Sequence, residues 1–374
     1  MLIAVPKEIK DGEKRVALVP DVISKLTRLG LDVSIESGAG THSQGTDADY
    51  ESAGAKVVNG DVLKIADVVL SVQPLTPAQM STLKKGAITI SFLSPTTAVD
   101  SIDAAAKAGV TAFSLELVPR ISRAQSMDAL TSQALCAGYR AALVGAELSP
   151  RFFPMLMTAA GTVTPAQVLV LGAGVAGLQA IATARRLGAV VSAYDVRPAS
   201  ADEVRSMGAA FIELELEALE GAGGYAREMT EERAAKQREL LTPHIAKSHV
   251  VITTAAVPGR TAPRLMTQAM VDSMQPGTII VDLAAETGGN VEGSKPGEIV
   301  VTKNGVRIWG GKDVPSQLPF HASSLYSRNV VNLLTLITKP AKDGEVASFN
   351  IDFEDEIVNG SAVTHDGARR GGTK

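Results

Sequence analysis

A glycine turn between two apolar runs is the stretch of the sequence best suited to chemistry. Gly172, Gly174 and Gly177 follow one apolar run, and Asp195 comes directly after a second, residues 190–194. This order of strand, glycine turn, helix, strand and acid is that of the dinucleotide-binding fingerprint. A glycine-bearing turn of another kind of α/β protein is the simpler alternative. We predict a nicotinamide dinucleotide site.

Each residue of the turn has a physical task in this interpretation. Gly172 allows the tight turn that leaves the strand, and Gly177 lets the following helix pack closely on it. Gly174 lets the backbone approach a pyrophosphate, and the amides of Val175 and Ala176 open the helix whose first turn faces the phosphates. We therefore expect this turn to bind the pyrophosphate.

The acid predicts which nucleotide binds. A carboxylate at Asp195 accepts hydrogen bonds from the adenosine ribose and disfavours a 2′-phosphate, so NAD(H) is preferred over NADP(H). Val196 and Arg197 follow it and belong to the same candidate site. Because an arginine here can serve a 2′-phosphate, Arg197 leaves the other preference open.

Composition narrows the class of protein. The chain has 374 residues, 45% of them apolar, 4% aromatic, and a net charge of -4. That length predicts two domains, and the scarcity of aromatic and basic clusters argues against nucleic acid. Cys136 is the single cysteine and the five histidines are scattered, so we expect no disulfide within the chain, no metal site and a reducing cytoplasm. Residues 152–184 carry no charge, but prolines and glycines interrupt them, and we expect a buried strand and helix there rather than a membrane span.

Alternating strand-like and helical runs predict an α/β fold with two Rossmann-like, doubly wound parallel-sheet domains. The helical run 323–337 should return to the first domain, which makes that domain discontinuous in sequence. We predict bounds of 1–130 plus 317–374 for the first domain and 131–316 for the NAD(H)-binding Rossmann domain. Expected strands lie at 2–5, 33–35, 68–72, 88–92 and 111–114, then at 168–171, 190–194, 210–212, 250–253, 278–282 and 306–309. Residues 349–353 alternate like a strand, and the tail from Gly367 is expected to be disordered.

Two loops carry polar groups. Residues 118–128 form a polar, irregular stretch ahead of a long helix expected at 132–148. Residues 221–224 are rich in glycine and precede Tyr225. That second loop is either a plain flexible insertion or a lid over the nucleotide.

Short motifs along nearly the whole chain resemble the NAD(H)-binding component, or domain I, of the alpha subunit of proton-translocating NAD(P) transhydrogenase. They lie at 5–8, 15–18, 120–128, 161–162, 172–181, 223–225, 282–284 and 314–316. The resemblance implies that hydride passes directly from NADH on this chain to NADP+ on a partner subunit. A membrane domain would couple this step to proton movement. It further implies a homodimer, and a cytoplasmic protein held at the inner side of the membrane by membrane-spanning partner subunits.

The resemblance also assigns residues. Arg120, Gln125 and Asp128 are the catalytic candidates, and they hold the nicotinamide end together with Thr131, where the family usually has serine. Gln125 would point toward the second nucleotide. Tyr225 joins the cofactor-binding set. The enzyme would be an NAD(P)+ transhydrogenase of the Si-specific, proton-translocating type, active only with its partner subunits.

Two other functions stay open at this point. Alanine dehydrogenase belongs to the same superfamily and shares Glu8 and Arg15. Its substrate-binding lysine and acid/base histidine correspond to Gln73 and Ser94 here, which leaves no proton acceptor for deamination. A catalytically silent NAD(H) sensor is the second alternative. Addition of an NADP-binding domain, or of pyruvate and ammonia, separates the three.

Overall fold

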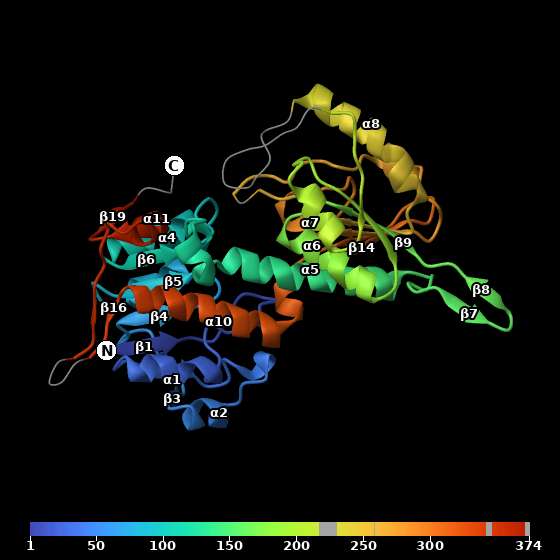
Figure 1. Ribbon diagram of the computed structural model, residues 1–374. Helices are drawn as coiled ribbons and strands as arrows, with labels where there is room; N and C mark the ends of the chain where they lie inside the picture. Colours follow the sequence, from blue (N-terminus) through green and yellow to red (C-terminus); the bar gives the residue numbers. More distant parts are fainter. Residues whose placement is uncertain (217–229, 258, 342–345, 371–374) are drawn as a thin grey trace. The chain divides into compact units, whose positions relative to one another are not determined.

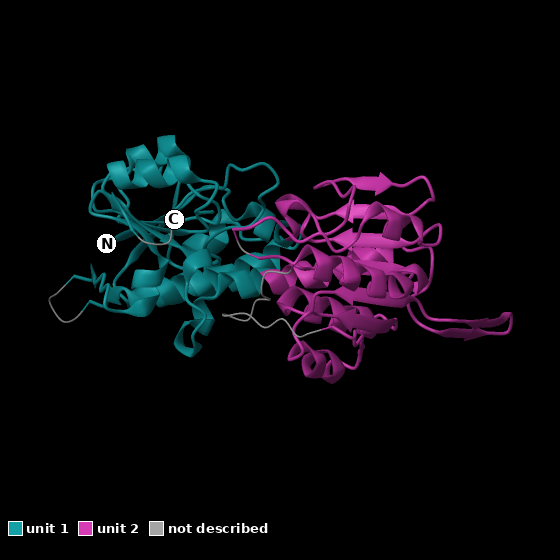
Figure 2. Ribbon diagram, turned by 90° about the horizontal axis from the view of Figure 1, so that it is seen from above, with its two compact units in different colours: residues 1–133, 315–374 teal, residues 134–314 magenta. Residues whose placement is uncertain are grey.

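The computed structural model describes residues 1–216, 230–257, 259–341 and 346–370. The chain forms two compact units, Met1–Gln133 with Pro315–Lys374 and Ala134–Val314 (Figure 2). The sequence predicted breaks after 130 and 316. Unit 1 is therefore assembled from both ends of the chain, and unit 2 from its middle.

Unit 1 is built on a mostly parallel sheet. Six parallel strands lie in the order β3-β2-β1-β4-β5-β6, the 3-2-1-4-5-6 order of a doubly wound dinucleotide fold. They are β1 (Leu2–Val5), β2 (Asp32–Glu36), β3 (Lys56–Val58), β4 (Val68–Leu70), β5 (Ile88–Ser91) and β6 (Thr111–Ser114). The helices of this unit are α1 (Pro20–Arg28), α2 (Asp47–Ser52), α3 (Pro77–Thr82), α4 (Val99–Lys107), α10 (Pro319–Leu336) and α11 (Glu356–Ser361).

Helix α10 ties the C-terminal segment to the N-terminal sheet (Figure 1). Tyr326, Val330 and Leu334 are fully buried in the same core cluster as Ile3 of β1. The Tyr326 hydroxyl donates to the carbonyl of Ser71 at 2.7 Å. The hydrophobic effect therefore holds together two segments that are far apart in the sequence.

The C-terminal end differs from expectation. Residues 362–365 form β18 (Ala362–His365), which pairs antiparallel with β6, and β19 (Ala368–Arg369) pairs with β18. Arg369 donates to Asp103, and the Arg370 guanidinium lies 3.6 Å from the centre of the Phe353 ring. The predicted disorder from Gly367 is wrong as far as residue 370, because pairing and cation–π contact order a stretch that lacks apolar residues. The strand predicted at 349–353 is reduced to β17 (Ser348–Phe349), which pairs with β16 (Thr338–Lys339).

Unit 2 has the same strand order. Its sheet runs β11-β10-β9-β12-β13-β15-β14, with β14 antiparallel at the edge. The strands are β9 (Gln167–Leu171), β10 (Val190–Tyr194), β11 (Ala210–Phe211), β12 (Val250–Thr253), β13 (Ile279–Asp282), β14 (Ile299–Val301) and β15 (Arg307–Gly310). Its helices are α6 (Val175–Arg186), α7 (Ser200–Ser206), α8 (Glu231–Lys247) and α9 (Gln268–Asp272), while α5 (Ala129–Leu148) contains the boundary between the units. Two Rossmann-like sheets confirm the predicted fold class.

A β-hairpin extends away from the sheet of unit 2 (Figure 1). It consists of β7 (Leu156–Thr158) and β8 (Gly161–Val163), and every residue of both strands is exposed. This hairpin was not predicted from the sequence, because its apolar residues suggested a buried segment. Their exposure returns below.

Candidate functional site

The glycine turn of unit 2 has the geometry that the fingerprint predicts. Gly172 has φ of +102°, in the region that favours glycine. A Cβ on Gly177 would lie 1.9 Å from the Gly172 carbonyl oxygen, so helix α6 passes too close for any side chain. A Cβ on Gly174 would meet nothing within 4 Å, which leaves open space beside this stretch of backbone. The tight turn and the close packing are present, and phosphate binding stays a prediction.

A further glycine supports the turn and was missed in the sequence. A Cβ on Gly138 of α5 would lie 2.0 Å from the carbonyl oxygen of Ala176. Helix α5 therefore packs directly on the first turn of α6, which holds Val175 and Ala176 in place. A glycine inside a long helical run was the available signal, because glycine there lowers helix stability unless close packing requires it.

Asp195 is held against the turn by protein donors. One of its oxygens accepts from the Ala173 amide at 2.7 Å and from Arg197 Nη2 at 2.9 Å. The other accepts from the Arg197 amide and from Arg197 Nε, both at 2.9 Å. This ion pair raises the pKa of Arg197. The acid lies where the fingerprint requires, but its partner in this structure is Arg197. Val196, between them, packs against the apolar cluster of unit 2.

The polar loop of unit 1 is more regular than expected. Residues 122–127 form the 3-10 helix η3 (Ser122–Met127), with Ala124 and Met127 buried. The carbonyl of Ser126 accepts from two amides of α10, Asn329 Nδ2 at 2.9 Å and Asn332 Nδ2 at 3.0 Å. Helix α10 thereby fixes the loop, a role that sequence reasoning did not assign to either asparagine.

The four predicted residues of this loop have different surroundings. Arg120 and Gln125 have exposed side chains. Asp128 caps helix α5, since its carboxylate accepts from the Thr131 amide at 2.9 Å and from Thr131 Oγ1 at 2.6 Å. Asp128 and Thr131 thus act as a pair that begins the helix. Tyr225 lies outside the described residues.

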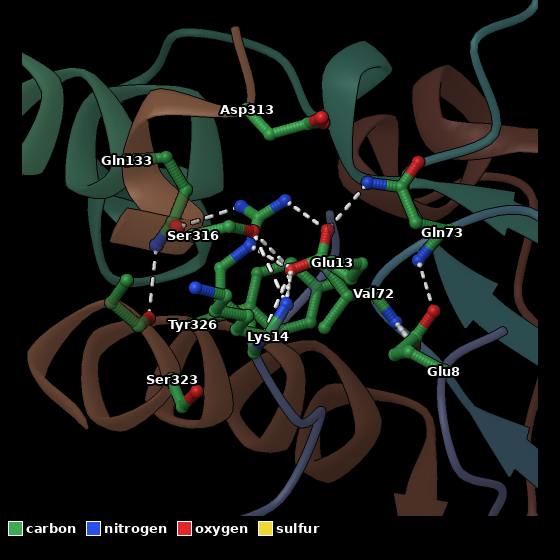
Figure 3. Close-up of polar contacts among 12 residues, drawn as sticks. Glu8, Glu13, Lys14, Val72, Gln73, Gln133, Asp313, Ser316, Ser323 and Tyr326 are labelled. Carbon is green, nitrogen blue, oxygen red and sulfur yellow. Dashed lines mark hydrogen bonds and ion pairs between the residues drawn. The ribbon is translucent and has the colours of Figure 1, made fainter. Parts of the chain in front are cut away.

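A buried charged cluster lies elsewhere in unit 1. The Glu13 carboxylate receives Arg15 Nε at 2.8 Å and Arg15 Nη2 at 2.6 Å, and Arg15 Nη1 donates to Gln133 at 2.9 Å. Gln73 Nε2 and the Ser316 hydroxyl also donate to Glu13, which lies between them in Figure 3. These donors lower the pKa of Glu13 to about 2 against the opposing effect of burial. All three guanidinium nitrogens of Arg15 are engaged by the protein itself.

Glu8 is the second acid near this cluster. Its carboxylate accepts from the amides of Val72 at 2.5 Å and Gln73 at 3.3 Å, and it lines a cavity of about 310 Å³ together with Lys7 and Lys10. Burial raises the pKa of Glu8 to about 7, and the nearby charge of Glu13 acts in the same direction. The two acids therefore carry different charges between pH 4.5 and 7.

We expect Glu8→Gln to change how stability depends on pH. The pKa of Glu8 is higher in the folded state, about 7, than its ordinary 4.5. Stability is therefore greatest below pH 4.5 and falls as the pH rises toward 7, by about 3 kcal/mol at most. Glutamine resembles the neutral acid, so the variant should lose this decline between pH 5 and 7. Thermal unfolding across that range measures it, with the exposed Glu51→Gln as control; equal pH slopes in Glu8→Gln and the original protein would contradict the assignment.

The comparisons with known proteins decide the family. The profile of the alanine dehydrogenase/PNT N-terminal domain matches residues 4–137, and that of the C-terminal domain matches residues 141–370. The chain belongs to the alanine dehydrogenase/PNT family. It is 48% identical to the first segment of the NAD(P) transhydrogenase subunit alpha of Rhodospirillum rubrum, a separate polypeptide there, over 98% of this chain and 97% of that one. Alanine dehydrogenase of Mycobacterium tuberculosis is 34% identical over 79% of this chain and 76% of its own length.

A solved structure agrees with the sequence comparison. Transhydrogenase from Sinorhizobium meliloti superimposes with a TM-score of 0.85 at 44% identity, covering 99% of this chain and 98% of that one. The chain is therefore a homologue of the transhydrogenase alpha subunit, and the predicted family is confirmed. In the described residues, no group of acids, histidines and cysteines could hold a metal ion, and no helix is long and apolar enough to cross a membrane.

Proposed function

We propose that this chain is the NAD(H)-binding component of a proton-translocating transhydrogenase. It passes hydride from NADH directly to NADP+ bound on a partner subunit, and a membrane domain couples that step to proton movement. The observation that carries the proposal is the glycine turn of unit 2, with Asp195 beside it, in a chain 48% identical to a transhydrogenase alpha subunit segment. Through those partners the protein associates with the inner side of the cytoplasmic membrane.

The proposal gives each predicted residue a task. The amides of Val175 and Ala176 hold the pyrophosphate beside Gly174, and Asp195 receives the adenosine ribose. Arg120, Gln125, Asp128 and Thr131 hold the nicotinamide end, and Tyr225 contacts the cofactor. Because nicotinamides exchange hydride without help from an acid, base or metal, the task of these residues is orientation.

The buried cluster of unit 1 favours this function over amino-acid oxidation. A keto-acid carboxylate requires a free cationic group, yet Arg15 is bound by Glu13 and Gln133, and Gln73 donates to the same Glu13. No proton acceptor stands at Ser94. We therefore expect no reaction with pyruvate and ammonia.

The deciding experiment mixes the purified chain with an NADP-binding transhydrogenase domain. The mixture should transfer hydride from NADH to NADP+, while the chain alone should turn over nothing. Oxidation of NADH by the chain with pyruvate and ammonia would instead identify an alanine dehydrogenase. Binding of NADH without turnover in either mixture would identify a sensor.

The exposed hairpin of unit 2 supports a homodimer. An isolated two-stranded hairpin is marginally stable in water, and this one carries exposed Met157 and Val163. At its base, Phe152, Phe153 and Leu187 line an apolar hollow of about 320 Å³. A second copy of the chain offers both a hairpin and a hollow, so each copy covers the apolar surface of the other.

We expect Met157→Asp to convert the dimer to a monomer. Met157 is 81% exposed, so an aspartate there costs the fold little but places a charge in the contact. Sedimentation velocity measures the mass, and NADH affinity should be unchanged. Val301→Asp, at a 65% exposed position on β14, is the matched control and should stay dimeric. A Met157→Asp protein that remains dimeric would exclude the hairpin as the contact.

A further inference from the structure

The acid that selects the nucleotide is fully occupied in this structure. Four hydrogen bonds from described residues reach the Asp195 carboxylate, two from the backbone amides of Ala173 and Arg197 and two from the Arg197 guanidinium. An ionised carboxylate offers about four lone-pair positions. The Asp195 side chain is only 7% exposed, while that of Arg197 is 24% exposed. Arg197 therefore covers the acid on its accessible side.

A ribose cannot bind Asp195 while this arrangement persists. The two backbone amides are fixed by the turn and by β10, so the guanidinium is the donor pair that can move. Ribose hydroxyls would take its place by donating to the same oxygens. The guanidinium that they displace would then lie next to the 2′-position of the adenosine.

We propose that Arg197 is a specificity-determining residue, and that its ion pair with Asp195 sets the preference for NAD(H). This inference rests on the proposed nucleotide site. Asp195 acts in two ways: it repels a 2′-phosphate, and it holds a nearby cation that would bind such a phosphate. Arg197 is thus a 2′-phosphate-binding group that the protein keeps occupied, because a carboxylate–arginine pair with two parallel hydrogen bonds is strong and geometrically specific.

The proposal predicts what happens when the pair is broken. In Asp195→Asn the guanidinium loses its counter-charge and can turn to a phosphate. NADPH should bind about 10-fold more tightly or better, and NADH about 10-fold more weakly. In Arg197→Ala, NADH no longer competes with the guanidinium, so its affinity should be equal or higher, with no gain for NADPH.

The test is a double-mutant cycle measured by calorimetric titration of NADH and NADPH. The Asp195→Asn/Arg197→Ala protein should lose the NADPH gain of Asp195→Asn and return to within about 3-fold of the original affinity. If the double variant keeps the gain, relief of repulsion alone explains it and Arg197 has no such role. If Asp195→Asn gives no gain, the proposal is equally overturned. Asp195→Ser, which keeps an acceptor for the Ala173 amide, replaces Asp195→Asn should the latter fail to fold.

The original protein distinguishes this inference from the proposed function. Failure of the unmodified chain to bind NADH would overturn both. Normal NADH binding with no effect of Arg197 on NADPH affinity would overturn the inference alone.

Discussion

Hydride transfer to NADP+ on the partner domain should fall by about 100-fold or more in Gln125→Asn, with little change in NADH affinity. The expected loss has a geometric cause. Gln125 lies exposed on η3, and that helix is held by Asn329 and Asn332 through the Ser126 carbonyl. Its amide is thus presented from a fixed backbone, and a shorter side chain withdraws it. Misplacement of reacting groups by about 1 Å can cost a factor of about 100 in rate.

The measurement is direct transfer in a mixture with the NADP-binding domain, next to equilibrium binding of NADH. Ser126→Ala is the matched control, because Ser126 is an exposed neighbour whose backbone carbonyl makes the structural contacts. That variant should transfer hydride normally. Unchanged transfer in Gln125→Asn would remove Gln125 from the site, and a parallel loss of NADH affinity would make it a binding residue only.

Replacing Glu13 with glutamine should destabilise the protein by about 3–5 kcal/mol, because it leaves a buried arginine without its counter-charge. Arg15 is 6% exposed and the Glu13 side chain is fully buried, with 2.6 Å between Nη2 and Oε2. Urea unfolding at neutral pH measures the loss. Glu13→Gln/Arg15→Met removes both charges and should recover much of the stability.

The same pair makes an opposite prediction at low pH. The folded-state pKa of Glu13 is about 2, below its ordinary 4.5, so its contribution is complete above pH 4.5 and is lost as the pH falls toward 2. Glu13→Gln should lack that acid-dependent loss. A variant as stable as the original protein at pH 7 would show that the ion pair is replaceable, and would weaken the argument that Arg15 is unavailable to a keto acid.

Much of the fold could be predicted because local patterns agree with it. Buried parallel strands such as β9 and β12 are nearly continuous apolar runs, and the glycine turn has one geometry wherever it occurs. Short edge strands were not predictable. β14, β18 and β19 have two to four residues and are defined by their partners, so β18 forms only because β6 lies beside it.

The sequence by itself determined the family, the two doubly wound sheets and the turn that is proposed to bind pyrophosphate, since these depend on residue types at fixed local spacing. Only the tertiary structure decided which partners the charged groups take. Glu13 meets Ser316 across 303 positions of sequence, and Ser126 meets Asn329 across 203. Such pairings follow from how the two ends of the chain pack into unit 1, and no local pattern records them. Even Asp195 and Arg197, two residues apart, could be seen as an ion pair only once the turn had brought Ala173 to the same carboxylate.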